Sequence, residues 1–125
     1  MKDDNPGALY ICATPIGNME DASFRLVSTL KEVDLILAED TRTTRKLLSR
    51  YEIGKKHIIS YHQHTDDAKL AHIIGLLKQG KKAALVSESG MPAVQDPGYR
   101  IINRCIEENI PVTVIPGPSA ALSAL

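Results

Sequence analysis

The sequence has few aromatic residues and no excess of charge of either sign. Tryptophan is absent, phenylalanine occurs once, and aromatic residues make up 4% of the 125 residues. Lys and Arg together number 15, as do Asp and Glu, so the formal net charge is zero. A neutral chain has no general basic field that would attract nucleic acid, so any such contact needs a local patch. The core must be built from aliphatic residues, which suits an α/β domain.

Several well-known site motifs are also missing. The chain contains no G-x-x-x-x-G-K-[ST] phosphate loop, no G-x-G-x-x-G dinucleotide motif and no G-x-S-x-G nucleophile motif. His62 and His64 are two residues apart with no cysteine near them in sequence, which is not zinc-ligand spacing. We therefore expect no metal site. The sequence is still compatible with a site in which small loops and a few carboxylates hold a ligand.

The chain has two cysteines and no apolar run long enough to cross a bilayer. Cys12 lies in an apolar, strand-like run, and Cys105 lies on the apolar side of a predicted helix. Two buried free thiols are expected, which favours a reducing, cytoplasmic setting. Residues 1–7 are acidic and polar, unlike a signal peptide. We expect no membrane partner.

Five apolar runs of strand length alternate with four segments of helical periodicity. The runs are Ala8–Ala13, Val33–Ala38, His57–Ser60, Ala83–Val86 and Val112–Ile115. The apolar residues at helical spacing are Phe24, Val27 and Leu30, then Leu47, Leu48 and Tyr51, then Leu70, Ile73, Ile74 and Leu77, with a fourth run from Tyr99 to Ile106. Such alternation predicts an α/β fold with a five-stranded, mostly parallel sheet and helices on both faces.

Helix-boundary signals accompany this pattern. Asp66 or Asp67 is expected to cap the third helix, and Gly80 is its expected end. Gly54 is expected to close the unit around the second helix. No internal repeat or interdomain linker precedes Leu125, so we expect a single domain. A chain of 125 residues is long enough for that domain to bury a hydrophobic core.

The segments that follow the strands differ in chemistry from the charged, plain segments that precede them. The segments that follow the strands are Thr14–Asn18, Glu39–Arg42, Tyr61–Thr65, Ser87–Gly98 and Pro116–Ser119. All five carry reactive or backbone-shaping residues, and in a parallel sheet all five lie at the carboxyl edge, where open α/β folds bind ligands. The sequence therefore predicts a ligand site at that edge.

Six motifs in these segments resemble a known family. They are Ala13–Asn18, Ala38–Arg42, Ser60–His62, Val86–Pro92, Asp96–Tyr99 and Pro116–Ser119. Together they resemble the N-terminal domain of the tetrapyrrole (corrin/porphyrin) methylases, in the ribosomal RNA small-subunit methyltransferase I branch. The resemblance covers nearly the whole chain.

The resemblance implies an S-adenosylmethionine-dependent methyltransferase with the cofactor between two α/β domains. This branch methylates a cytidine ribose 2′-hydroxyl in small-subunit ribosomal RNA, and family members are usually homodimers. Residues 1–125 correspond to the N-terminal domain, and residues 118–125 are expected to begin the connection to a C-terminal domain that is absent here. We therefore expect this chain alone to be inactive. The positions that line the cofactor by resemblance are Pro15, Gly17, Glu88, Ser89, Gly90, Met91, Ser119 and Ala120.

Three residues are candidates for catalysis, because methyl transfer to a hydroxyl needs an acceptor for its proton. Glu39 or Asp40 could act as the base or orient the ribose, although Asp40 could simply cap the helix that starts at Thr41. His62 could accept a proton, as histidine side chains often do in catalysis, although a loop histidine is more often a hydrogen-bonding residue.

Basic residues form a stripe on the second predicted helix. Arg42, Lys46 and Arg50 recur at i, i+4 and i+8, with Arg45 beside them. The stripe could receive RNA phosphates, with Arg42 and Arg45 as the RNA-binding candidates, or be an ordinary solvated helix face.

Two other functions stay open. One is methylation of a tetrapyrrole, against which the Thr14–Asn18 loop speaks, because that branch favours a Gly-rich loop there. The other is a divergent, non-catalytic binding domain. The loop of Glu88, Ser89, Gly90 and Met91 keeps this alternative open, because it departs from the usual Asp-Ala-Gly-Thr of the branch.

Overall fold

The computed structural model describes residues 7–13, 24–62, 64–87 and 97–115. Within these ranges five strands alternate with four helices, as the apolar pattern predicts. The elements are β1 (Ala8–Ala13), α1 (Phe24–Glu32), β2 (Leu35–Ala38), α2 (Thr41–Arg50), β3 (His57–Ser60), α3 (Asp67–Lys78), β4 (Lys82–Ser87), α4 (Pro97–Glu107) and β5 (Val112–Ile115).

The five strands form one sheet in the order β3-β2-β4-β1-β5, and every pair of neighbours is parallel. The registers place the ends of neighbouring strands within one residue of one another. Ala38 of β2 pairs with Ser60 of β3 and with Val86 of β4, and Ala13 of β1 pairs with Ser87 of β4. All the carboxyl ends therefore meet at one edge of the sheet.

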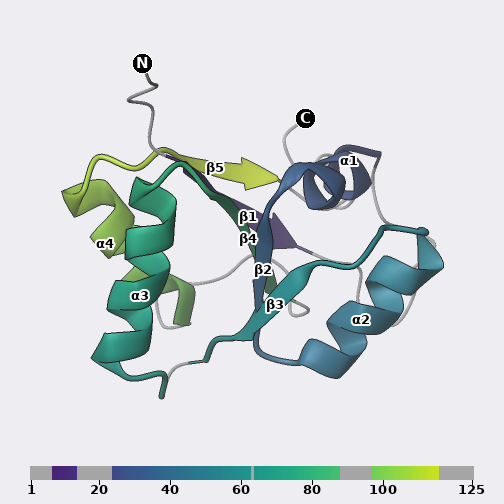
Figure 1. Ribbon diagram of the computed structural model, residues 1–125, viewed down its shortest axis with the longest axis horizontal. Coiled ribbons are helices and arrows are strands. Elements are labelled where there is room, and N and C mark those ends of the chain that lie inside the picture. The colour runs from purple at the N-terminus through teal and green to yellow at the C-terminus, as the bar shows by residue number, and fades with distance from the viewer. Residues whose placement is uncertain (1–6, 14–23, 63, 88–96, 116–125) are drawn as a thin grey trace, which may run out of the picture.

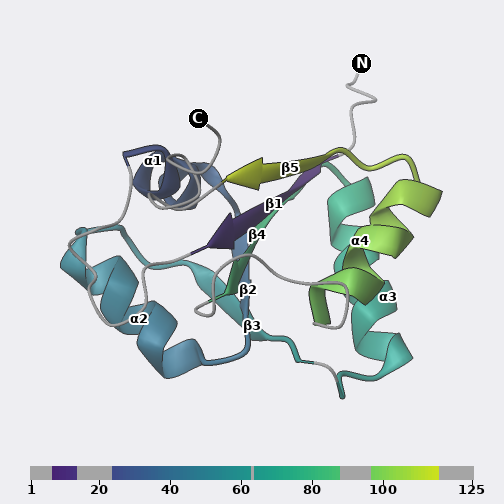
Figure 2. The same ribbon diagram turned by 180° about the vertical axis from the view of Figure 1, so that it is seen from behind.

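Helices cover both faces of the sheet, so the predicted α/β class is confirmed. Helices α1 and α2 lie on one face, and α3 and α4 lie on the other (Figure 1, and from behind in Figure 2). Successive strand residues point to opposite faces. Thus Ile36 joins the core under α1 and α2, whereas Leu35 and Leu37 join the core under α3 and α4. Each strand residue of β2 is buried.

Three of the helices end in a residue with left-handed backbone. In α3 the N–H of Gly80 donates to Leu77 O at 3.1 Å, and the N–H of Lys81 donates to Leu76 O at 3.2 Å. This is the Schellman arrangement, in which glycine is favoured at the left-handed position, so the predicted end of α3 is confirmed. The left-handed residues are Glu52 (φ 57°) after α2, Gly80 (φ 100°) after α3 and Asn109 (φ 61°) after α4. The chain therefore turns after α2 at Glu52, two residues before the predicted Gly54.

Helix α1 buries the face that its sequence suggests except for Phe24, since Leu30 is in the core and Val27 packs against it. Phe24, predicted to be part of the apolar face, is 89% exposed, whereas Leu26 and Leu30 are buried. At 3.6 residues per turn, Phe24 projects about 200° away from Leu26, on the opposite side of the helix. Leu26 and Leu30 are four residues apart and lie on the side that faces the sheet, which leaves Phe24 outside the core.

The second strand begins later than its apolar run, because Asp34 interrupts it. The Asp34 carboxylate accepts the N–H of Lys82 at 2.8 Å, and the Asp34 N–H donates to Lys82 O at 2.8 Å. Asp34 therefore binds the start of β4 through its side chain as well as its backbone, and β2 starts at Leu35.

Both cysteines are free and buried, as predicted. Burial raises the pKa of Cys12 to about 12 and that of Cys105 to about 11. A thiol with such a pKa stays protonated at neutral pH, and the thiolate is the reactive form. The two cysteines therefore serve as small apolar core residues.

Candidate functional site at the carboxyl edge of the sheet

Three neighbouring strands lead into the segments that carry the cofactor candidates. These strands are β4, β1 and β5, and their ends are paired, Ser87 with Ala13 and Ile115 with Cys12. Neighbouring strands lie about 4.8 Å apart, so the three ends span about 10 Å. The cofactor candidates follow these strands in sequence but lie outside the described residues. They are Pro15 and Gly17 after β1, Glu88, Ser89, Gly90 and Met91 after β4, and Ser119 and Ala120 after β5.

The catalytic candidates follow the other two strands. Glu39 and Asp40 come directly after β2, and His62 comes two residues after β3. The N–H of Tyr61 donates to Ala38 O at 3.0 Å, which continues the pairing of β2 with β3 beyond Ser60. The sheet order thus divides the predicted site into catalytic candidates on one side and cofactor candidates on the other, with β2 and β4 as neighbours at the boundary.

The connections from β1 and β4 lead to opposite faces of the sheet. Strand β1 is followed by α1, and its neighbour β4 is followed by α4 on the other face (Figures 1 and 2). In open parallel sheets, ligands bind where neighbouring strands lead to helices on opposite faces. The topology therefore supports the carboxyl ends of β1 and β4 as the centre of a ligand site.

Asp40 is the N-cap of α2. One carboxylate oxygen accepts the N–H groups of Arg42 and Thr43, both at 3.1 Å, and the other accepts the Thr43 hydroxyl at 2.9 Å. These bonds from Thr43, and then the bond and charge of Arg42, lower the pKa of the Asp40 carboxyl below its ordinary 3.8. A carboxylate so bonded is a weaker proton acceptor, so the geometry favours the capping role.

The capping carboxylate predicts a specific pH dependence. Because the folded-state pKa of Asp40 is lowered, its stabilisation is present above the ordinary value of 3.8 and is lost as the pH falls through the folded-state pKa. Asp40→Asn keeps a capping oxygen without this titration. We expect equal urea midpoints for wild type and variant near pH 7, and a smaller acid-induced drop for the variant. Equal acid-induced drops would contradict the assignment.

Glu39 is the second acidic candidate at this edge. Its side chain is exposed, and it has no hydrogen-bond or ion-pair partner among the residues that the structure describes. Asp40, next in the chain, is occupied by the helix cap. Of the two acidic candidates, Glu39 is therefore the one available to a ligand.

The ring of His62 is oriented by its own turn. Its Nδ1 accepts the N–H of His64 at 3.1 Å, and the two rings meet edge to face with centroids 6.2 Å apart. Because Nδ1 is an acceptor in this bond, the neutral ring carries its proton on Nε2. His62 is therefore arranged to donate a hydrogen bond from Nε2, and less suited to accept a proton there.

Helix α2 carries an exposed basic face that starts at the carboxyl edge. Arg42, Arg45, Lys46 and Arg50 are exposed, and the helix contains no acidic residue. Arg42, Arg45 and Lys46 form no ion pair within the described part of the chain. Both predicted RNA-binding residues are therefore accessible, and Arg42 is two residues from the Asp40 cap.

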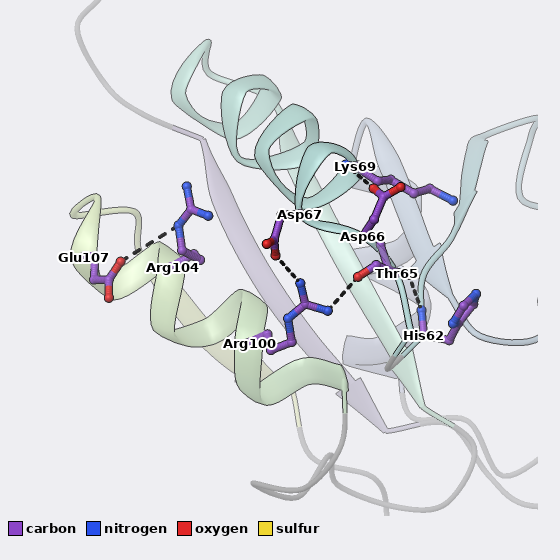
Figure 3. Close-up of polar contacts among 8 residues, drawn as sticks. All are labelled: His62, Thr65, Asp66, Asp67, Lys69, Arg100, Arg104 and Glu107. Atoms are coloured by element: carbon purple, nitrogen blue, oxygen red, sulfur yellow. Dashed lines mark hydrogen bonds and ion pairs between the residues drawn. The ribbon is translucent and has the colours of Figure 1, made fainter.

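Two further residues at this edge were not predicted. Thr65 is buried, and its hydroxyl accepts the N–H of His62 at 2.8 Å. Arg100, in the first turns of α4, donates to Thr65 O at 2.7 Å and to Asp67 at 2.8 Å (Figure 3). Arg100 directly follows the Asp96–Tyr99 motif, and this position was the only sign of a role in the sequence. That its partner is Thr65 could not be predicted from the sequence.

The described residues contain neither a metal-ligand cluster nor a membrane-spanning helix. None of their His, Cys, Asp and Glu side chains form a group of three or more that could hold a metal ion. None of their helices is long and apolar enough to cross a membrane.

An open, all-parallel sheet with polar segments at its carboxyl edge defines an α/β ligand-binding domain. Residues 8–125 match the family model of the Tetrapyrrole (Corrin/Porphyrin) Methylases, and the chain belongs to this family. The resemblance in the six motifs is thereby confirmed.

Two relatives in sequence carry the same name, Ribosomal RNA small subunit methyltransferase I. The protein from Thermotoga maritima is 50% identical over 119 residues, which cover 95% of this chain and 53% of the relative. The protein from Halalkalibacterium halodurans is 50% identical over 122 residues, which cover 98% of this chain and 42% of the relative. The chain thus spans about half the length of these relatives.

The fold is also similar to a solved structure. Uroporphyrin-III-C-methyltransferase from Thermus thermophilus superposes with a TM-score of 0.68 and 22% identity, over 89% of this chain and 47% of that one. At this identity the similarity is one of fold.

Proposed function

We propose that this chain is the N-terminal domain of an S-adenosylmethionine-dependent methyltransferase that acts on small-subunit ribosomal RNA. The acceptor in this proposal is the 2′-hydroxyl of a cytidine ribose. The protein works in the cytoplasm as a homodimer, and a C-terminal domain after residues 118–125 completes the cofactor site. The names of the relatives, at 50% identity, support the RNA substrate.

The sheet order is the observation that carries this proposal. The three segments with the cofactor candidates begin at adjacent strands, β4, β1 and β5, although they are far apart in sequence. Glu39 follows β2, which is beside β4, and His62 follows β3, which is beside β2. A cofactor near β1 and β4 and an acceptor near β2 and β3 would therefore be neighbours.

The residue types in these segments suit S-adenosylmethionine, which when bound supplies an electrophilic methyl group. Glu88 offers a carboxylate that can accept hydrogen bonds from amino or hydroxyl groups. Gly17 and Gly90 let a ligand approach the backbone closely, because glycine has no Cβ. Pro15, Ser89, Met91, Ser119 and Ala120 complete the proposed cofactor-binding set.

The chemistry at the acceptor requires a proton acceptor and correct placement. Transfer breaks the methyl–sulfur bond, forms a methyl–oxygen bond and releases the 2′-hydroxyl proton. Glu39, exposed and without a partner in the described residues, takes this proton in our proposal. His62 donates from Nε2 to the RNA, and Asp40 holds the start of α2 in place.

Arg42 and Arg45 bind RNA phosphates in this proposal, which predicts a change in salt dependence. Each phosphate contact contributes about 0.7 to 0.9 to the slope of log affinity against log salt. We expect the double variant R42A/R45A to weaken RNA binding and reduce that slope by about 1.5. The control K31A/K81A removes two exposed lysines at the amino edge. Equal slopes in wild type and R42A/R45A would remove these arginines from the interface.

Calorimetry of the full-length protein with S-adenosylmethionine tests the cofactor assignment. We expect saturable binding to the full-length protein and at least about tenfold weaker binding to the 125-residue chain, because binding energy is lost when half of a site is missing. No binding to the full-length protein would overturn the proposal in favour of a non-catalytic domain. Equal affinity for both would show that the C-terminal half adds nothing to the site.

A further inference from the structure

The turn after β3 is closed by two hydrogen bonds between its first and last residues. The N–H of His62 donates to Thr65 Oγ1 at 2.8 Å, and the N–H of Thr65 donates to His62 O at 2.9 Å. Thr65 is 6% exposed. Because both bonds join the same two residues, the position of the Thr65 backbone determines where the His62 backbone lies.

Arg100 holds Thr65 from the neighbouring helix. Its Nη1 donates to Thr65 O at 2.7 Å, and its Nη2 donates to Asp67 Oδ1 at 2.8 Å (Figure 3). The Asp67 side chain is 96% exposed, so that ion pair contributes little. The bond to the Thr65 carbonyl is partly buried and has a charged donor, which makes it the stronger of the two.

A second ion pair joins the same two helices at their other ends. Lys78 Nζ, in the last turn of α3, lies 2.9 Å from Glu108 Oε1, just after α4. This pair is at the amino edge of the sheet, whereas Arg100 is at the carboxyl edge. The Lys78–Glu108 pair therefore connects the same two helices as the Arg100–Asp67 pair, at a similar N–O distance but at the opposite edge of the sheet.

We propose that Arg100 is a positioning residue that sets the place of His62 through Thr65. The guanidinium fixes the Thr65 carbonyl against the first turns of α4, and Thr65 in turn fixes the backbone of His62. The ring of His62 then has its Nδ1 bonded to His64 and its Nε2 available as a donor. The catalytic consequence rests on the function proposed above, and the structural link does not.

Amide hydrogen exchange on the full-length protein tests the structural link directly. In R100M we expect the amides of His62 and Thr65 to exchange at least about tenfold faster, because the turn loses its anchor. K78M removes the matched ion pair and is expected to leave these two amides unchanged. T65V should release the His62 amide alone, and T65S should restore its protection, because serine keeps the hydroxyl.

Methyl-transfer kinetics on small ribosomal subunits test the consequence. A displacement of about 1 Å can reduce a rate about 100-fold, so we expect kcat of R100M to fall by about 10- to 100-fold. KM for S-adenosylmethionine should change less than about threefold, because the cofactor candidates are on other strands. R100K should recover part of kcat, because lysine keeps one charged donor but not the planar fork.

Two results would overturn this inference. One is unchanged exchange of the His62 and Thr65 amides in R100M, and the other is an equal effect of K78M and R100M on exchange or on kcat. If R100M is unfolded in thermal denaturation, R100K decides the question, because it keeps one charged donor and should exchange the His62 and Thr65 amides faster than wild type. If the wild-type protein methylates no RNA, the proposed function fails, and the exchange rates alone then decide the role of Arg100.

Discussion

Replacing Glu39 with glutamine is expected to lower the rate of methyl transfer by the full-length protein about 100-fold, the size typical of a lost general base. Glu39 is exposed at the end of β2 and has no partner in the part of the chain that the structure describes, so the change removes no stabilising contact there. The thermal midpoint should stay within about 1 °C of wild type, as expected for a surface substitution. Single-turnover kinetics with radiolabelled cofactor measure the rate.

Asp40→Asn is the matched control for this prediction. It alters the neighbouring carboxylate by the same chemical step, but Asp40 serves as the N-cap of α2, and asparagine is an equally good cap. We expect D40N to keep more than about half of the wild-type rate, because its contribution is structural. If D40N abolishes transfer and Glu39→Gln does not, the roles of the two carboxylates are reversed.

Leu37→Ala is expected to destabilise the domain by about 2 to 5 kcal/mol, the usual cost of truncating a buried leucine. Leu37 is 0% exposed, in the centre of β2, and packs in the core under α3 and α4. Domains of this size are stable by about 5 to 15 kcal/mol, so the loss is a large share of the total. Urea denaturation followed by circular dichroism measures it.

Ile106→Ala is the control for the core prediction. Ile106 lies on α4 but is 62% exposed, so its truncation leaves no cavity. We expect its cost to stay below about 1 kcal/mol. Equal costs for Leu37→Ala and Ile106→Ala would mean that the assignment of the core to β2 and its two helix layers is wrong.

The strands and most helix ends could be predicted from sequence because their signals are local. β1, β3 and β5 have the predicted bounds, and the expected cap and end of α3 are confirmed at Asp66 and Gly80. In parallel sheets buried on both faces, strands are continuous apolar runs, which makes them easy to recognise. The strand order β3-β2-β4-β1-β5 could not be predicted, since it depends on which elements pack together.

In α1, helical spacing was wrong for one residue, Phe24. Of the predicted residues Phe24, Val27 and Leu30, the last two pack in or against the core and only Phe24 does not. Leu26, which the spacing did not include, is buried with them. A single aromatic residue at the start of a short helix carries little positional information. Packing against the sheet decides which side is buried, and Phe24 is left exposed.

The candidate site was predicted by location better than by role. The sequence indicated that Glu39, Asp40 and His62 would gather at the carboxyl edge, and the sheet registers place their strands side by side. It left two roles open for Asp40, of which the structure shows the cap of α2, and it could not say that the Nδ1 of His62 accepts the N–H of His64. Nor could it find Arg100, whose partner Thr65 is 35 residues away in sequence.

Mass spectrometry of nucleosides tests the central proposal most directly. The full-length protein would be incubated with deuterated-methyl S-adenosylmethionine and with small ribosomal subunits from a strain lacking the methylase. The RNA would then be digested to nucleosides. We predict label in 2′-O-methylcytidine, present with wild type and about 100-fold slower to appear with Glu39→Gln. Label in a base-methylated nucleoside, or no label in RNA despite cofactor binding, would contradict the account.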